Sequence, residues 1–158
     1  MDLSMDVIAV LKTIPLFLEF SPAQLEQIGK ISDLVELDPG DIPIKEGSLP
    51  DFVYVVLEGE ISVKFLIPTK GQVETSKLGM YDIIGWSALT PIIRQSTATI
   101  TALTHCWLLR VDGRLLTKLC EEDHTIGFII YRRISNVAAR SFLTTRLQLM
   151  NLLTSSSN

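Results

Sequence analysis

The stretch that decides the fold is Gly79-Met80-Tyr81-Asp82-Ile83-Ile84-Gly85-Trp86-Ser87-Ala88-Leu89, followed shortly by Ser96-Thr97-Ala98. Gly85 permits a tight turn and a close backbone approach between an apolar strand and a helix start. The first N–H groups of a helix have no partner within it and attract anions. The pattern therefore predicts a cassette over residues 79–98 that cradles an anionic group. The residues expected to line it are Gly85, Trp86, Ser87, Ala88, Ser96, Thr97 and Ala98.

Composition indicates one folded domain over residues 1–158. A chain of 158 residues with 47% hydrophobic and 20% charged side chains is long enough and apolar enough to bury a core. It has 14 Lys and Arg against 18 Asp and Glu, a net charge of -4. Because nucleic-acid binding depends on an excess of basic residues, we expect no direct nucleic-acid partner.

The cysteines and the N-terminus indicate the compartment. Cys106 and Cys120 form no CxxC pair, so we expect two free thiols in a reducing environment. The N-terminal segment carries Asp2 and Asp6 and is broken by Pro15, unlike a signal peptide. No apolar run reaches the ~18 residues of a membrane span. The expected location is the cytoplasm, away from membranes.

The hydrophobic pattern predicts a mainly β fold with flanking helices. Residues 1–30 carry helical signals, including Ser21 as an N-cap before Pro22. Residues 31–111 contain short runs rich in Val, Ile, Phe and Thr between glycine turns, the pattern of an antiparallel barrel. Residues 112–153 return to helical periodicity, with 154–158 as a disordered tail. We therefore expect a jelly-roll-like double-stranded β-helix followed by a long C-terminal helix.

That last helix, expected from about Thr125 to Leu153, has two surfaces of interest. One stripe is apolar up to Val137 and then turns polar at Ser141 and Thr144. A second line, Leu143, Leu147 and Met150, is more apolar than a solvated helix requires, which favours a homodimer through this helix. The simplest interpretation of its arginines is a solvated face, with pairing to a partner's acids as the alternative: Arg132, Arg133, Arg140 and Arg146.

Three glycine-turn motifs occur in a fixed order along the chain. They are Gly40-Asp41-Ile42-Pro43-Ile44-Lys45-Glu46-Gly47, then Asp51 to Val63 around Leu57-Glu58-Gly59-Glu60, then Gly79 to Leu89 with Thr97-Ala98-Thr99-Ile100. Together they resemble the cyclic nucleotide-binding domain of catabolite-activator-type regulators, protein kinase A regulatory subunits and gated channels. The resemblance covers nearly the whole chain. It implies the barrel fold and a non-catalytic regulatory role.

The resemblance also implies a ligand site, from which this sequence departs at two positions. The family has a glutamate after the cassette glycine for the ribose hydroxyl and an arginine before Thr97-Ala98 for the cyclic phosphate; this chain has Trp86 and Ser96. Without both charged contacts, cyclic nucleotide binding should be weaker by roughly a hundredfold to ten-thousandfold. Arg94, about 6.6 Å from Ser96 if the strand is extended, is a candidate substitute clamp, the alternative being a solvated loop arginine.

Two interpretations of Trp86 and of the polar helix residues stay open at this point. Trp86 either stacks on a flat ligand or fills the vacated site as part of the core. Ser87, Ser96 and Thr97 either bind an anion or cap their own backbone. In the family, small polar side chains of the last helix touch the nucleotide base across the dimer, which makes Thr144 and Thr145 candidates; alternatively, the helix simply leaves its packed region there.

We therefore expect a regulatory module that binds a small anionic, nucleotide-like ligand and signals through the last helix, with no other cofactor. His105 and His124 are too few for the metal site of a cupin enzyme, so we expect no metal and no enzymatic activity. One alternative is a ligand-free module for dimerisation or for docking a partner protein. Another is the sensor half of a transcription regulator whose DNA-reading helix-turn-helix lies outside this sequence.

Overall fold

The computed structural model describes residues 6–156. Its elements in chain order are α1 (Val7–Leu11), η1 (Pro15–Phe17), α2 (Pro22–Gly29), β1 (Ser32–Leu37), β2 (Phe52–Glu58), β3 (Ile61–Ile67), β4 (Gly71–Leu78), β5 (Ile83–Ile84), η2 (Trp86–Leu89), β6 (Thr99–Ala102), β7 (Cys106–Asp112), α3 (Gly113–Glu122) and α4 (His124–Ser155). Strands occupy the middle of the chain and helices both ends, so the predicted fold class is confirmed.

The strands form two antiparallel sheets. One sheet has the order β1-β7-β2-β5 and the other β4-β3-β6, linked by an isolated bridge between Ile44 and Ile100. Within residues 6–156 the sheets share no strand, so the barrel is not closed by hydrogen bonds. A hairpin turn joins β3 to β4, with Ile67 of β3 paired to Gly71 of β4.

Two strands, β2 and β7, are covered on both faces, which explains their continuous apolar sequences. In β2, Val53 and Val55 pack into a core shared with the helices, whereas Tyr54 and Val56 pack into a second core between the sheets. The strand β7 divides in the same way. Because successive side chains of a strand point to opposite faces, a strand buried on both faces has no polar alternation.

The predicted helix starts are confirmed by their caps. Ser21 accepts a hydrogen bond from the Gln24 amide while the Gln24 side chain accepts from the Ser21 amide, a complete capping box for α2. The Asp112 carboxylate accepts from the Leu115 amide at the start of α3. The first helix, within the residues 1–30 expected to be helical, spans Val7–Leu11, and residues 1–5 lie outside the described residues.

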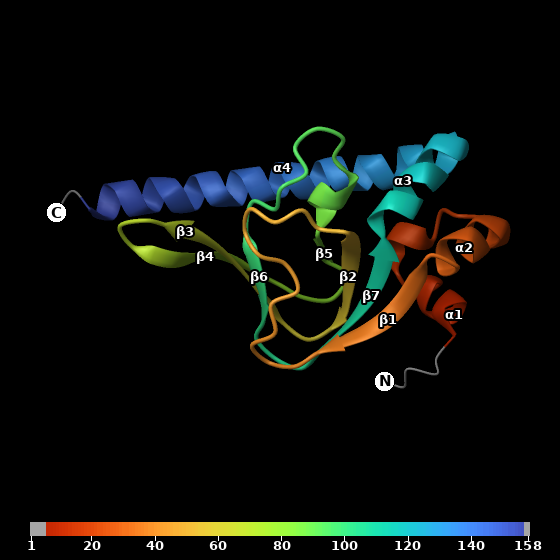
Figure 1. The fold of residues 1–158 in the computed structure, drawn as a ribbon, viewed down its shortest axis with the longest axis horizontal. Coiled ribbons are helices and arrows are strands. Elements are labelled where there is room, and N and C mark those ends of the chain that lie inside the picture. Colours follow the sequence, from red (N-terminus) through yellow and green to blue (C-terminus); the bar gives the residue numbers. More distant parts are fainter. Residues whose placement is uncertain (1–5, 157–158) are drawn as a thin grey trace.

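Figure 1 shows α4 running along the whole molecule, with α1, α2 and α3 near its start and the β3–β4 hairpin beside its end. The Lys70 ammonium at the hairpin tip donates to the Ser156 hydroxyl at 2.8 Å. Thr154 and Ser155, expected in a tail, belong to α4, and residues 157–158 of that expected tail lie outside the described residues. None of the helices among the described residues could cross a membrane.

Both cysteines are buried and free, as expected. Cys106 lies between the sheets, and Cys120 lies in the core under α3. Burial raises the pKa of the Cys120 thiol to about 11, helped by the nearby charges of Glu121 and Asp123. This thiol is therefore protonated and unreactive near neutral pH.

Candidate functional site

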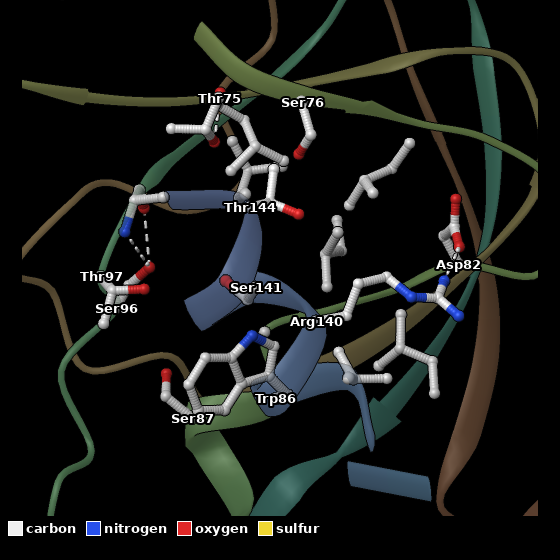
Figure 2. A pocket seen from close by; sticks show the side chains of 18 of the residues that line it. Thr75, Ser76, Asp82, Trp86, Ser87, Ser96, Thr97, Arg140, Ser141 and Thr144 are labelled. Atoms are coloured by element: carbon white, nitrogen blue, oxygen red, sulfur yellow. Dashed lines mark hydrogen bonds and ion pairs between the residues drawn. The ribbon is translucent and has the colours of Figure 1, made fainter. Parts of the chain in front are cut away.

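A cavity of about 90 Å³ lies between the cassette, strand β4 and helix α4. Figure 2 shows Trp86 and Ser87 on one side, Thr75 and Ser76 of β4 opposite, and α4 across it. Of the residues predicted to bind a ligand, its wall contains Gly85, Trp86, Ser87, Ser96, Thr97, Ala98 and Thr144. The cassette and the polar part of the last helix, which begins 43 residues after Ala98 at Ser141, therefore meet at one site.

Gly85 makes the predicted strand-to-helix turn possible. It adopts a left-handed conformation, φ 74° and ψ 19°, between β5 and η2. A Cβ at this position would collide with the Phe52 carbonyl oxygen of the neighbouring strand. The helix that follows has only four residues, Trp86–Leu89. Its dipole is correspondingly small, so an anion in this cavity needs positive charge from elsewhere.

Trp86 lines the cavity and is only partly buried. Part of its indole ring packs against the core shared by the sheet and the helices. Space remains beside the ring, and Ser141 of α4 also lines that space (Figure 2). The indole is thus a wall of the cavity in this structure, rather than a plug that closes it.

The hydroxyls of the cassette are used in different ways. The Ser96 hydroxyl donates to the Ala98 carbonyl at 2.7 Å and accepts weakly from the Ala98 amide at 3.4 Å. It therefore caps its own backbone, which is the alternative to ligand binding that the sequence left open. Ser87 is buried, and within residues 6–156 its hydroxyl makes no hydrogen bond. Ser87 is the better placed of the two to bind a ligand.

Helix α4 contributes two arginines that the sequence assigned to a solvated face. Arg133 and Arg140 line the cavity together with Val137, Ser141 and Thr144, at spacings that place them on one stripe of the helix. The Arg133 Nε is buried and has no hydrogen-bond partner within the part of the chain that the structure describes. The positive charge of this site therefore comes from the helix, whereas the family resemblance placed it in the cassette.

The turn at the start of the cassette places one acidic group in the cavity wall. Tyr81 adopts a left-handed conformation with φ 67° that is rare outside glycine, and its amide donates to the Val56 carbonyl at 2.7 Å. This turn brings Asp82 toward α4, where its Oδ1 lies 4.0 Å from the Arg140 Nη1 (Figure 2). The other carboxylate oxygen accepts from the Gly79 amide at 2.9 Å.

Three predicted site residues lie elsewhere. Arg94 is exposed in the loop before β6 and lines surface hollows with Arg114 instead of the cavity wall, so its role as a substitute clamp stays a prediction. The loop is not extended there, which removes the assumed geometry. Ala88, a cassette residue, is buried against Gly113 and does not line the cavity. Thr145 lies beside the stripe of α4 that lines the cavity.

A second link joins α4 to the cassette. The Tyr131 hydroxyl donates to the Leu89 carbonyl, the last residue of η2, at 3.0 Å. Burial raises the pKa of Tyr131, and the nearby Cys120 adds to this effect. The hydroxyl is therefore a neutral donor at physiological pH, and it holds the start of α4 against the end of the cassette.

The family model for the cyclic nucleotide-binding domain matches residues 34–123, more than half of the chain. The chain belongs to this family. Among proteins of curated function no sequence matches significantly. The matched residues run from β1 to the end of α3, so they include the cassette, whereas the arginines of α4 lie beyond them.

Solved structures with this fold come from several regulatory systems. A cyclic nucleotide-binding domain from Methylobacillus flagellatus is 19% identical, with 92% of this chain and 82% of that one covered and a TM-score of 0.73. The N-terminal domain of a transcriptional regulator from Streptomyces coelicolor is 26% identical, with 89% and 94% covered and a TM-score of 0.64. The regulatory subunit of a cAMP-independent protein kinase A from Trypanosoma brucei is 20% identical, with 89% and 50% covered and a TM-score of 0.70.

As a cyclic nucleotide-binding domain, the chain keeps the backbone of the cassette but has a different set of charges. The cavity wall holds Trp86 and Ser96 where the resemblance implied a carboxylate and a guanidinium. The described residues contain no group of three or more His, Cys, Asp or Glu side chains that could hold a metal ion. The charged groups that face the cavity are Asp82, Arg133 and Arg140.

Proposed function

We propose that this chain is a non-catalytic, cytoplasmic sensor domain that binds a small anionic ligand in the cavity between the cassette and α4. The observation that carries the proposal is Arg133, which lines this cavity as well as a neighbouring hollow and whose buried Nε has no hydrogen-bond partner among residues 6–156. Leaving a buried donor unpaired costs about 1–3 kcal/mol, and an anionic acceptor would remove that cost. Membership of a family that binds small anionic ligands supports the same site.

Binding of the proposed ligand would change how α4 packs over the sheet. It would contact the cassette on one side and the stripe from Arg133 to Thr144 on the other, so its affinity depends on how α4 lies over the sheet. A ligand shifts a conformational equilibrium only by its difference in affinity for the two states. The Tyr131–Leu89 hydrogen bond and the Arg140–Asp82 ion pair are the existing links that such a shift would alter.

The output of the sensor would be a homodimer through the second half of α4. Beyond the cavity, this helix exposes a series of large apolar side chains: Phe142, Leu143, Leu147, Met150 and Leu153. A second copy of the same helix would bury them, and ligand-dependent packing of α4 would then change the dimer. Sedimentation of the protein with and without ligand tests this output.

A titration series tests the binding proposal. Cyclic AMP, cyclic GMP, cyclic dinucleotides, inorganic phosphate and aromatic and aliphatic acids are added while the melting temperature is followed. A ligand at a hundredfold excess over its Kd adds about 2.7 kcal/mol, roughly 5–10 °C for a domain of this size. Ser141→Met, which fills the cavity, should remove the response, and Ser135→Met, on the exposed face of α4, should keep it.

One alternative is a ligand-free docking module for a second copy or another protein. The observation that favours it is the packing of Trp86 against the main core beside a small cavity. On this alternative no compound of the series shifts the melting temperature, and Ser141→Met stabilises the protein by filling unused space.

A second alternative is the sensor half of a transcription regulator. The relative from Streptomyces coelicolor is the N-terminal domain of such a protein. A helix-turn-helix following residue 158 in the same reading frame would support this alternative.

A further inference from the structure

The charges that face the cavity do not balance. Of the residues in its wall, Arg133 and Arg140 are positive and Asp82 is negative, which leaves one net positive charge. A ligand that neutralises this wall carries a single negative charge. A doubly charged phosphate would instead place its second charge near Asp82, where the two would repel.

The two arginines are not equivalent. Arg140 lies 4.0 Å from Asp82 and is largely exposed, so its charge is already matched in part. The neighbouring Arg132 is held by Glu19 at 2.6 Å, outside this cavity. Within residues 6–156, Arg133 has neither an ion-pair partner nor a hydrogen bond to its buried Nε. Arg133 is therefore the guanidinium with a free edge, and such an edge binds a carboxylate through two parallel hydrogen bonds.

The remaining wall combines apolar side chains with seven Ser and Thr side chains, and one part of it is flat. Ile84, Leu78 and Val137 line the cavity, and the Trp86 indole forms one side. Aromatic rings pack on one another in offset or edge-to-face arrangements that contribute about 0.5–1.5 kcal/mol beyond the buried area. A planar ring can therefore lie against this part of the wall.

The cassette side of the cavity offers no clamp for a phosphate. The Ser96 hydroxyl, at the position where the family resemblance implies an arginine, is already bonded to the Ala98 carbonyl. The cavity is partly open, so its volume of about 90 Å³ does not set the size of the ligand.

From these four observations we propose that the ligand is a single-ring aromatic carboxylate. Its carboxylate binds the guanidinium of Arg133, and its ring lies against the Trp86 indole. The inference rests on the proposed sensor function and names the ligand class for the same cavity. It makes Arg133 and Trp86 the residues that determine specificity, in place of the two charged cassette positions of the family resemblance.

Calorimetric titration of the whole chain tests this proposal. The probes are benzoate, phenylacetate and 4-hydroxybenzoate, each titrated into the millimolar range, with the uncharged benzamide as the matched control. At least one acid should bind, with benzamide more than about tenfold weaker, because a charged hydrogen-bonded pair is worth about that factor or more. Arg133→Gln should weaken binding by a similar factor, and Arg132→Gln should leave it unchanged. Trp86→Leu should weaken the acids and benzamide alike.

The outcomes separate this inference from the sensor proposal. If cyclic nucleotides or phosphate bind in an Arg133-dependent manner and the aromatic acids do not, the inference is overturned and the sensor proposal stands. If no anion in either series binds to the folded protein, both are overturned. Equal binding of benzoate and benzamide would also overturn the inference. This comparison uses only the parent chain, so it does not depend on whether a variant folds.

Discussion

The Arg140 Nη1 lies 4.0 Å from the Asp82 Oδ1, which joins the middle of α4 to the turn that begins the cassette. The same carboxylate accepts a hydrogen bond from the Gly79 amide at 2.9 Å. Asp82 therefore has two functions, one inside its own turn and one toward the helix. Because the Arg140 side chain is 71% exposed, we expect the turn to depend on Asp82 more than the helix does.

Substitutions at these two residues should differ in their effect on stability. Asp82→Ala removes the bond to the Gly79 amide and should lower the free energy of unfolding by about 0.5–1.5 kcal/mol. Arg140→Gln removes only an exposed ion pair and should change it by less than about 0.5 kcal/mol. Urea unfolding of both variants measures the difference. An equal loss in the two variants would show that the ion pair itself stabilises the fold.

The cassette turn should tolerate a side chain at Gly85 poorly. Gly85→Ala forces a Cβ into a left-handed residue and against the Phe52 carbonyl. Gly40→Ala is the matched control, because Gly40 has φ 94° but open space around it. The control should cost about 1–2 kcal/mol from backbone strain alone, and Gly85→Ala about 1–3 kcal/mol more. Thermal unfolding of both variants measures the difference. Equal melting temperatures for the two variants would contradict this account.

Restoring the two charges of the family resemblance should change ligand preference. Trp86→Glu with Ser96→Arg supplies the carboxylate for the ribose and the guanidinium for the cyclic phosphate. Two charge-assisted contacts should raise cyclic AMP affinity by roughly a hundredfold to ten-thousandfold. Calorimetric titration of the double variant against the parent chain gives the ratio. A ratio near one, in a folded variant, would mean that the cassette backbone no longer fits a cyclic phosphate.

The junction between α2 and α4 should make stability depend on pH in the acid range. The hydrogen bond from the Gln24 side chain, followed by the Ile126 amide, lowers the pKa of Asp123 below its usual 3.8. A carboxylate with a lowered folded pKa stabilises the protein above its unfolded value and loses that contribution as pH falls through the folded value.

The stability difference between the parent chain and Asp123→Asn should therefore be constant above about pH 5 and shrink as the pH falls below about 4. Urea unfolding at a series of pH values measures it. A difference that stays constant down to about pH 2 would contradict the assignment to Asp123.

Much of the fold follows from local signals in the sequence. Ser21 and Asp112 cap helices because their side chains reach backbone amides only two or three residues away. The apolar runs of β2 and β7 predict strands covered on both faces, and both are. Whether the barrel closes depends on contacts between strands that are distant in the sequence. The hydrophobic pattern of the sequence does not show which of these strands pair.

The charged part of the candidate site is the main element that the sequence did not reveal. Helical periodicity placed Arg133 and Arg140 on a solvated face, because an arginine on a helix is usually exposed. Only the position of α4 over the cassette brings them into the cavity wall. Arg94, in contrast, lies outside this wall, since the loop before β6 bends where an extended strand was assumed. The sequence did contain a signal for this part of the site. One stripe of the last helix carries five of the residues that line the cavity: Arg133, Val137, Arg140, Ser141 and Thr144.

The central claim, that this cavity binds an anion through α4, is tested most directly by NMR of the arginine Nε–Hε groups. The Arg133 resonance, assigned with Arg133→Gln, should shift when the anions of the two series are added, because its Nε gains an acceptor. The Arg132 resonance, whose guanidinium is held by Glu19, should stay in place. If the Arg133 signal remains unchanged at saturating concentrations of every anion, the account of this site is wrong.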